Sequence, residues 1–125
     1  MIIQDIKTLM EVQKEFSQKF PFLQIKFYAG THQAGETSPM QQKLDSQLTI
    51  GEARTIHDEG DLSINANQKI STLEQNFMEK FGLNVQVFRK SGNLWLQTSK
   101  TDHWTLAEAN RKGEHSSIAY EEKYS

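Results

Sequence analysis

The stretch LSINANQKISTLEQNFMEKFGLNVQVFR, residues 62–89, decides the fold because it repeats MIIQDIKTLMEVQKEFSQKFPFLQIKFY, residues 1–28, at a constant offset of 61. Five residues are identical at that offset: Ile3, Phe16, Lys19, Phe20 and Phe27 return as Ile64, Phe77, Lys80, Phe81 and Phe88. Between them, Leu9 and Val12 return as the apolar residues Ile70 and Leu73. The repeat predicts two units, each a helix followed by a strand, and it carries no chemistry of its own.

Within each unit, the spacing of apolar residues predicts the elements. Three- and four-residue spacing predicts an amphipathic helix over residues 5–20, and the next residues, LQIKFYA, alternate as in a half-buried strand. The same helical spacing covers roughly residues 68–81, and Gly82 follows as a left-handed cap. At the offset of 61 the two strands are out of phase, because Phe27 lies on the aliphatic face of its strand and Phe88 does not.

The clearest hairpin joins NVQVFRK, residues 84–90, to NLWLQTS, residues 93–99, through a turn at Ser91-Gly92. Strand alternation places four aliphatic side chains on one face, which we expect to be core: Val85, Val87, Leu94 and Leu96. Phe88 and Trp95 then share the opposite face with polar side chains. A turn one residue later would change the cross-strand partners but not the two faces.

The other segments are less regular. Residues 30–45 have no hydrophobic period and predict a long mobile loop, and a short element follows around Gln47–Ile50. Thr105 to Glu108 has the capping-box pattern and opens a last helix to about Lys112, and TIGEA from Thr49 repeats its form. We expect residues 116–125 to be a frayed tail.

These elements predict an α+β fold, a two-layer sandwich of helices on a mostly antiparallel sheet, in a single domain over residues 1–115. If residues 1–3 form a strand, the units become strand-helix-strand twice over. That order would be a ferredoxin-like βαββαβ core with an added strand and a C-terminal helix. If residues 1–3 begin the first helix, only the two-layer prediction remains. The sequence leaves both alternatives open.

Composition excludes several classes of function. The chain of 125 residues has no cysteine, which excludes disulfides, thiolate zinc sites and a cysteine nucleophile. It has no apolar run of about 20 residues and no signal-peptide pattern at its start, so we expect a soluble cytoplasmic protein with no membrane contact. The net charge of -2 and a pI near 6.1 make a poor polyanion binder, although the stretch from Lys80 to Lys100 is basic without an acid.

The hairpin carries the main functional hypothesis. Its aromatic face and the basic residues beside it would bind a partner protein or a second copy of the chain, through Phe88, Arg89, Lys90, Trp95 and Gln97. The plainer alternative is that a helix or the C-terminal tail covers the two aromatic rings, or that they form a cross-strand pair. Stacking on single-stranded nucleic acid is a weaker alternative.

An enzyme is the other alternative, with a polar site near His57, Asp58 and His103 under the 30–45 loop. The residues from His57 to Asp61 fit a turn better than a metal loop, and Asp102 beside His103 fits a helix cap better than an acid–base pair. No nucleophile motif, paired metal ligands or glycine-rich phosphate loop is present. We therefore predict no catalytic residue, metal or cofactor.

A resemblance adds one expectation. The run VQVFRKSGNLWLQTSKTDHWTLAEAN, residues 85–110, resembles a segment of small uncharacterised bacterial proteins of unknown function. The resemblance implies a bacterial cytoplasmic protein and implies no catalytic or binding residue.

Overall fold

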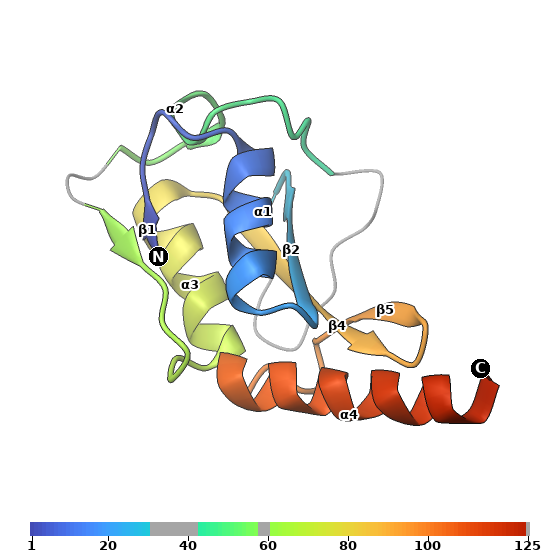
Figure 1. Cartoon of the computed structure of the whole chain (residues 1–125). Helices are drawn as coiled ribbons and strands as arrows, with labels where there is room; N and C mark the ends of the chain where they lie inside the picture. Colours follow the sequence, from blue (N-terminus) through green and yellow to red (C-terminus); the bar gives the residue numbers. More distant parts are fainter. Residues whose placement is uncertain (31–42, 58–60, 125) are drawn as a thin grey trace.

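Two helices cover one face of a three-stranded antiparallel sheet in the computed structural model, which describes residues 1–30, 43–57 and 61–124 (Figure 1). The helices are α1 (Leu9–Lys19) and α3 (Ile70–Phe81). The sheet has the order β2 (Leu23–Tyr28), β4 (Asn84–Ser91) and β5 (Leu94–Gln97). This arrangement confirms the predicted α+β class with helices packed on a sheet. Most of the 30–45 segment lies outside the described residues.

The chain start forms a strand, which answers the question that the sequence left open. β1 (Ile2–Ile3) pairs antiparallel with β3 (Leu62–Ser63), and the two make a separate two-stranded sheet. The Met1 ammonium group extends this pairing by donating to Ile64 O at 2.9 Å. A ferredoxin-like core would need these strands in one sheet with β2 and β4, so the ferredoxin-like alternative is wrong.

The repeat is visible as the same order of elements, β1-α1-β2 and β3-α3-β4. β2 and β4 pair antiparallel with Ile25 opposite Val87. Helices α1 and α3 match at the offset of 61, but we align Ile25 with Val87, at an offset of 62, because both face the core and the C-caps of the preceding helices, Phe20 and Gly82, also differ by 62. The additional residue is Gly82, whose φ of 63° forms the left-handed cap after α3. This insertion explains the phase difference between the strands: the counterpart of Phe88 is Lys26, not Phe27.

The helices begin in pairs, and each pair exchanges main-chain hydrogen bonds. α2 (Ile50–Ala53) begins beside α1, where Leu9 N–H donates to Leu48 O and Ile50 N–H donates to Lys7 O, both at 2.8 Å. The second amide of each helix adds another such bond, from Met10 to Ser46 O at 3.0 Å and from Gly51 to Asp5 O at 3.0 Å. These bonds satisfy amides that have no partner within a helix.

The same exchange joins α3 to α4 (Leu106–Tyr124). Its four bonds run from Ile70 to Trp104 O, from Ser71 to Asp102 O, from Leu106 to Gln68 O and from Ala107 to Ala66 O, at 2.8–3.0 Å. The Thr49 and Thr105 patterns therefore mark equivalent helix starts in the two repeats. Each Thr side chain accepts from the third amide of its helix, at 3.1 Å in both cases.

Helix α4 is longer than the sequence predicts. It was expected to end at about Lys112, but it continues to Tyr124, so residues 116–124 of the expected frayed tail are helical. It crosses the end of the sheet where β2 begins, and Phe22 N–H donates to Asn110 Oδ1 at 2.8 Å (Figure 1). Neither α4 nor another helix among the described residues is long and apolar enough to cross a membrane.

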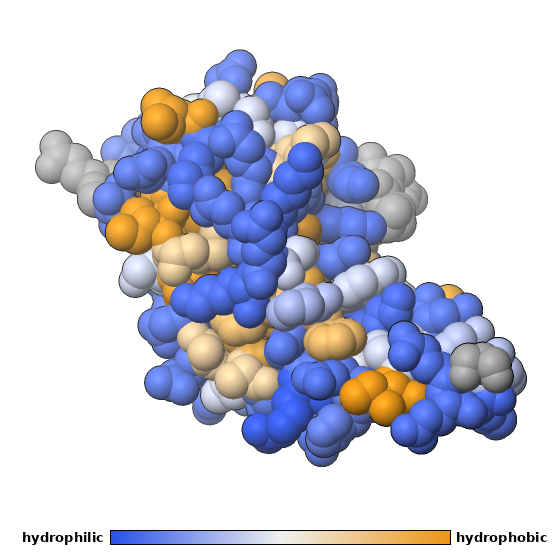
Figure 2. Space-filling view, viewed as in Figure 1, coloured by the Kyte–Doolittle hydropathy of each residue, from blue (hydrophilic) through white to orange (hydrophobic). Residues whose placement is uncertain are grey.

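The core lies between the helices and the sheet, and both repeats contribute to it. Its members include matched residues of the two units: Ile3 and Ile64, Leu9 and Ile70, Val12 and Leu73, Phe16 and Phe77, Phe20 and Phe81. Phe27 of the first unit meets Phe77 of the second edge to face at 5.8 Å. Outside the core the visible surface is mainly polar with separate apolar patches (Figure 2).

Candidate functional site

The predicted hairpin is present with its turn one residue later. Ser91 pairs with Leu94, so the turn residues are Gly92 and Asn93. The remaining pairs place Lys90 opposite Trp95, Arg89 opposite Leu96 and Phe88 opposite Gln97. Residues that pair directly share a face, so the two predicted faces are kept.

Exposure on these faces differs from the prediction. Val85 and Val87 are buried as expected, but Leu94 is 60 % exposed and Leu96 is 45 % exposed. The reason is their position: they pair with Arg89 and Ser91, in the half-buried part of β4, and this half of the hairpin lies beyond α1 and α3. Its turn rests on α4, where Gly92 N–H donates to Ser116 Oγ at 2.7 Å (Figure 1). Phe88, the expected contact residue, is only 6 % exposed, and the Lys26 ammonium group lies 4.8 Å from its ring centroid.

The candidate partner-binding residues do not form one patch. Trp95 is half-buried, and the Lys90 ammonium group lies 5.2 Å from its ring. Arg89 is on the opposite face, where its guanidinium lies 5.6 Å from the Trp104 ring. Gln97 is half-buried beside Phe88. The projecting hairpin therefore offers Trp95 on one face and the two leucines on the other.

The histidines of the enzyme alternative lie far apart. The segment before His57 is joined to the end of α3, since Thr55 N–H donates to Phe81 O at 2.8 Å. His103 lies at the other end of α3, where Ser71 N–H donates to Asp102 O. A helix of 12 residues separates them, a length of about 18 Å. Both are exposed, and Asp58 lies outside the described residues. In the described ranges, no three His, Asp or Glu side chains are placed to hold a metal ion.

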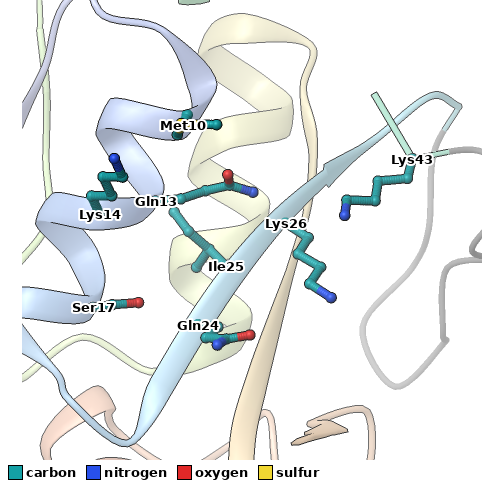
Figure 3. A pocket seen from close by; sticks show the side chains of 8 residues that line it. All are labelled: Met10, Gln13, Lys14, Ser17, Gln24, Ile25, Lys26 and Lys43. Carbon is teal, nitrogen blue, oxygen red and sulfur yellow. The ribbon is translucent and has the colours of Figure 1, made fainter. Parts of the chain in front are cut away.

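A groove that the sequence did not reveal lies between α1 and the edge of the sheet (Figure 3). Its volume is about 270 Å³. Its lining comes from α1, β2 and the residue that pairs with the end of β2, and consists of Met10, Gln13, Lys14, Ser17, Gln24, Ile25, Lys26 and Lys43. Gln13 extends from α1 toward β2, whereas Lys26 and Lys43 lie on the other side of the strand (Figure 3).

Among the described residues β2 is the outer strand of its sheet, and the groove contains a stretch of this edge to which no described strand pairs. At the start of the β2–β4 ladder, Lys90 N–H donates to Phe22 O at 3.0 Å. Bonded positions alternate along an antiparallel ladder, so the main-chain groups of Ile25 point away from β4. The edge is closed on both sides of Ile25, where Leu23 O accepts from Ser17 Oγ at 3.1 Å and Phe27 O accepts from Leu44 N–H at 2.8 Å.

The groove is positively charged. Three of its lining residues are lysines, Lys14, Lys26 and Lys43, and none of its described lining residues is acidic. Burial lowers the pKa of Lys26 from its ordinary value, and the nearby Lys43 charge lowers it further. Both causes disfavour the charged form of Lys26, and an anion placed beside it would favour that form.

Comparisons with known proteins give no relative: no family model, curated protein or solved structure matches the chain.

Proposed function

We propose that this protein is a non-catalytic interaction domain that binds another protein through the hairpin surface, which we define as Leu94, Trp95 and Leu96 of β5. The exposure of the two leucines carries the proposal. Single exposed leucines are ordinary, but two on one short strand form an apolar surface, and the neighbouring Trp95 is of a residue type enriched at interfaces.

The energetics favour a partner on this surface. Fully burying one leucine side chain contributes roughly 1.5–3 kcal/mol. The hairpin lies beyond α1 and α3 and its turn is held against α4, where Gly92 N–H donates to Ser116 Oγ at 2.7 Å, so Leu94 and Leu96 are presented from a fixed strand (Figure 1). Lys90 holds the Trp95 ring on one face, and a ring already positioned loses less side-chain entropy on binding.

The alternatives have less support. Lys90 and Arg89 each lie over a tryptophan ring, on opposite faces of the hairpin, so they do not form one basic track for single-stranded nucleic acid. The positions of His57 and His103 favour no reaction. A second copy of the chain remains a candidate partner, and the experiment separates it from a different protein.

Site-specific photo-crosslinking in the source cell tests the proposal. A photoreactive residue at position 96 is compared with one at position 6, because Ile6 is an apolar side chain with 82 % exposure that lies outside the hairpin. We expect a defined crosslinked protein from position 96 and none from position 6. The Leu94→Ser/Leu96→Ser variant with a photoreactive residue at position 95 should lose that product.

The identity and mass of the product decide the partner. A product of twice the chain mass, with a dimer in light scattering, identifies a second copy, and any other defined mass identifies a different protein. Both support an interaction domain. Equal crosslinking from positions 6 and 96, or a product that survives the Leu94→Ser/Leu96→Ser change, would overturn the proposal.

A further inference from the structure

In the second repeat, a carboxylate accepts the hydrogen bond of a main-chain N–H group of β4 that no strand accepts. β5 pairs with β4 only from Phe88 onward, so the Val87 main chain lies where β5 has ended. Thr98 N–H donates to Val87 O at 3.2 Å, and Val87 N–H donates to the carboxylate of Glu74 on α3 at 3.0 Å. Gln86 Nε2 donates to the same Glu74 oxygen at 3.3 Å. Glu74 is only 7 % exposed, so this carboxylate is an internal part of the fold.

The first repeat has the same donors without the carboxylate. At the strand offset of 62, Ile25 corresponds to Val87 and Gln24 corresponds to Gln86. At the helix offset of 61, the counterpart of Glu74 is Gln13, a neutral amide. Ile25, Gln24 and Gln13 all line the groove. Within the described residues, no hydrogen bond joins Gln13 to Ile25.

The residues around Gln13 are also more positively charged than those around Glu74. The counterparts of Lys14 and Lys26 in the second repeat are Gln75 and Phe88, which are uncharged. The first repeat therefore lacks the negative charge of Glu74 and has additional lysines along the groove, with Lys14 on the α1 side and Lys26 and Lys43 on the other side of β2 (Figure 3). Charge complementarity favours a carboxylate from outside the chain.

We propose that the groove binds an acidic side chain of a short extended segment from a partner protein, with the carboxylate at the position that Glu74 occupies in the second repeat. The carboxylate accepts from Ile25 N–H and from the Gln24 amide, and the lysines attract it. The segment pairs with the β2 edge, which is how extended peptides add to an exposed sheet edge.

The occupant is an extended segment because Ile25 presents two groups to the groove. A free carboxylate can accept from Ile25 N–H, but it has no donor for Ile25 C=O. An extended segment supplies both groups, because its acidic side chain accepts from Ile25 N–H while one of its main-chain N–H groups donates to Ile25 O, as Thr98 N–H does to Val87 O in the second repeat. The edge is closed at Leu23 and Phe27, so the pairing is short and centres on Ile25. This site shares no residue with the hairpin surface, and each proposal can fail without the other.

An NMR titration of the full ¹⁵N-labelled chain tests the inference with three probes. These are a peptide of alternating glutamate and valine, the same peptide with glutamine in place of glutamate, and acetate. We expect the glutamate peptide to shift the Ile25 amide downfield, as a new hydrogen bond does. The glutamine peptide and acetate at equal concentration should leave it unchanged.

The Gln13→Glu variant is the sharpest test, because it installs in the first repeat the carboxylate that the second repeat already has. We expect it to lower affinity for the glutamate peptide about tenfold or more, since an internal acceptor then competes for Ile25 N–H. The matched control is Gln18→Glu, the same change at an exposed position of α1 outside the groove, which should lower affinity much less.

Four results would overturn the inference. The Ile25 amide could stay unshifted with the glutamate peptide, or shift equally with the glutamine peptide. Acetate could match the peptide, which would make the groove a site for small carboxylates. Finally, Gln13→Glu and Gln18→Glu could lower affinity equally, which would show that net charge alone decides binding.

Discussion

At the residue scale, the Glu74 carboxylate provides the hydrogen-bond acceptor at the edge of β4 where β5 has ended. It accepts from Val87 N–H and Gln86 Nε2 in a buried position. Glu74→Gln keeps one acceptor oxygen but places an NH₂ group beside two donors. We expect it to lower the free energy of unfolding by about 1–3 kcal/mol, measured from urea denaturation curves.

The control for that change is Glu79→Gln, which removes the same charge from an exposed position of the same helix. It should change the free energy of unfolding by less than about 0.5 kcal/mol. Equal denaturation midpoints for the two variants would contradict the role of Glu74.

The sequence predicts the face of a strand on which a side chain lies better than it predicts whether that side chain is exposed. The alternation of Val85, Val87, Leu94 and Leu96 places all four on one face, as the structure confirms. Whether a residue on that face is buried depends on whether a helix reaches it, and no local pattern encodes this.

The sequence does not predict the groove, because its only signal is a difference between the two repeats. Gln13 stands where the second repeat has Glu74, and the strands that follow are shifted by one residue at Gly82, which the constant offset of 61 does not show.

At the element scale, the position of α4 depends on a close approach. A methyl group added at Gly113 would lie 2.9 Å from Phe22 Cβ, 3.1 Å from Phe22 O and 3.4 Å from Lys90 O. Alanine favours a helix over glycine by about 1 kcal/mol, but two of these neighbours are main-chain atoms that cannot move alone. We therefore expect Gly113→Ala to destabilise the protein by about 1–3 kcal/mol in thermal unfolding.

The neighbouring change Glu114→Ala serves as its control, because position 114 is exposed on the same helix and alanine suits it. The thermal midpoint of Glu114→Ala should stay close to that of the unmodified chain. If Gly113→Ala instead raised the midpoint, helix propensity would outweigh the contact, and α4 would not be held closely against Phe22.

Helices were more predictable than the pairing of strands. The apolar stripes of α1 and α3 and the capping threonines are local patterns, so the sequence places these helices within a few residues. Residues 1–3 could not be assigned, because Ile2 and Ile3 fit a helical stripe as well as a strand. The strand forms through pairing with residues 62 and 63, about 60 positions away, and its identity is a tertiary effect.

The whole molecule is two repeats that share one core. β2 pairs with β4, and Phe27 packs against Phe77, so each repeat covers apolar surface of the other. We expect residues 1–61 expressed alone to lack helical circular dichroism, because β2 then has no partner strand. Adding residues 62–125 should restore the signal of the intact chain.

A stable, monomeric fold of residues 1–61 would contradict that expectation. The comparison needs the 1–61 fragment with Phe27→Ala as its control, because truncating a ring at the contact between repeats should weaken recovery on mixing. Recovery that is the same with and without this ring would mean that the two repeats fold independently.

The paired helix starts restrict which anions the molecule can receive. A helix start usually offers free amides to a phosphate group, which is how many nucleotide sites are built. In α1, α2 and α4 the first two amides donate to the opposite helix start and the third donates to a capping threonine. These three helices have little left to offer a nucleotide. We therefore expect an anion to be bound by lysine side chains and by main-chain N–H groups at a strand edge, such as that of Ile25.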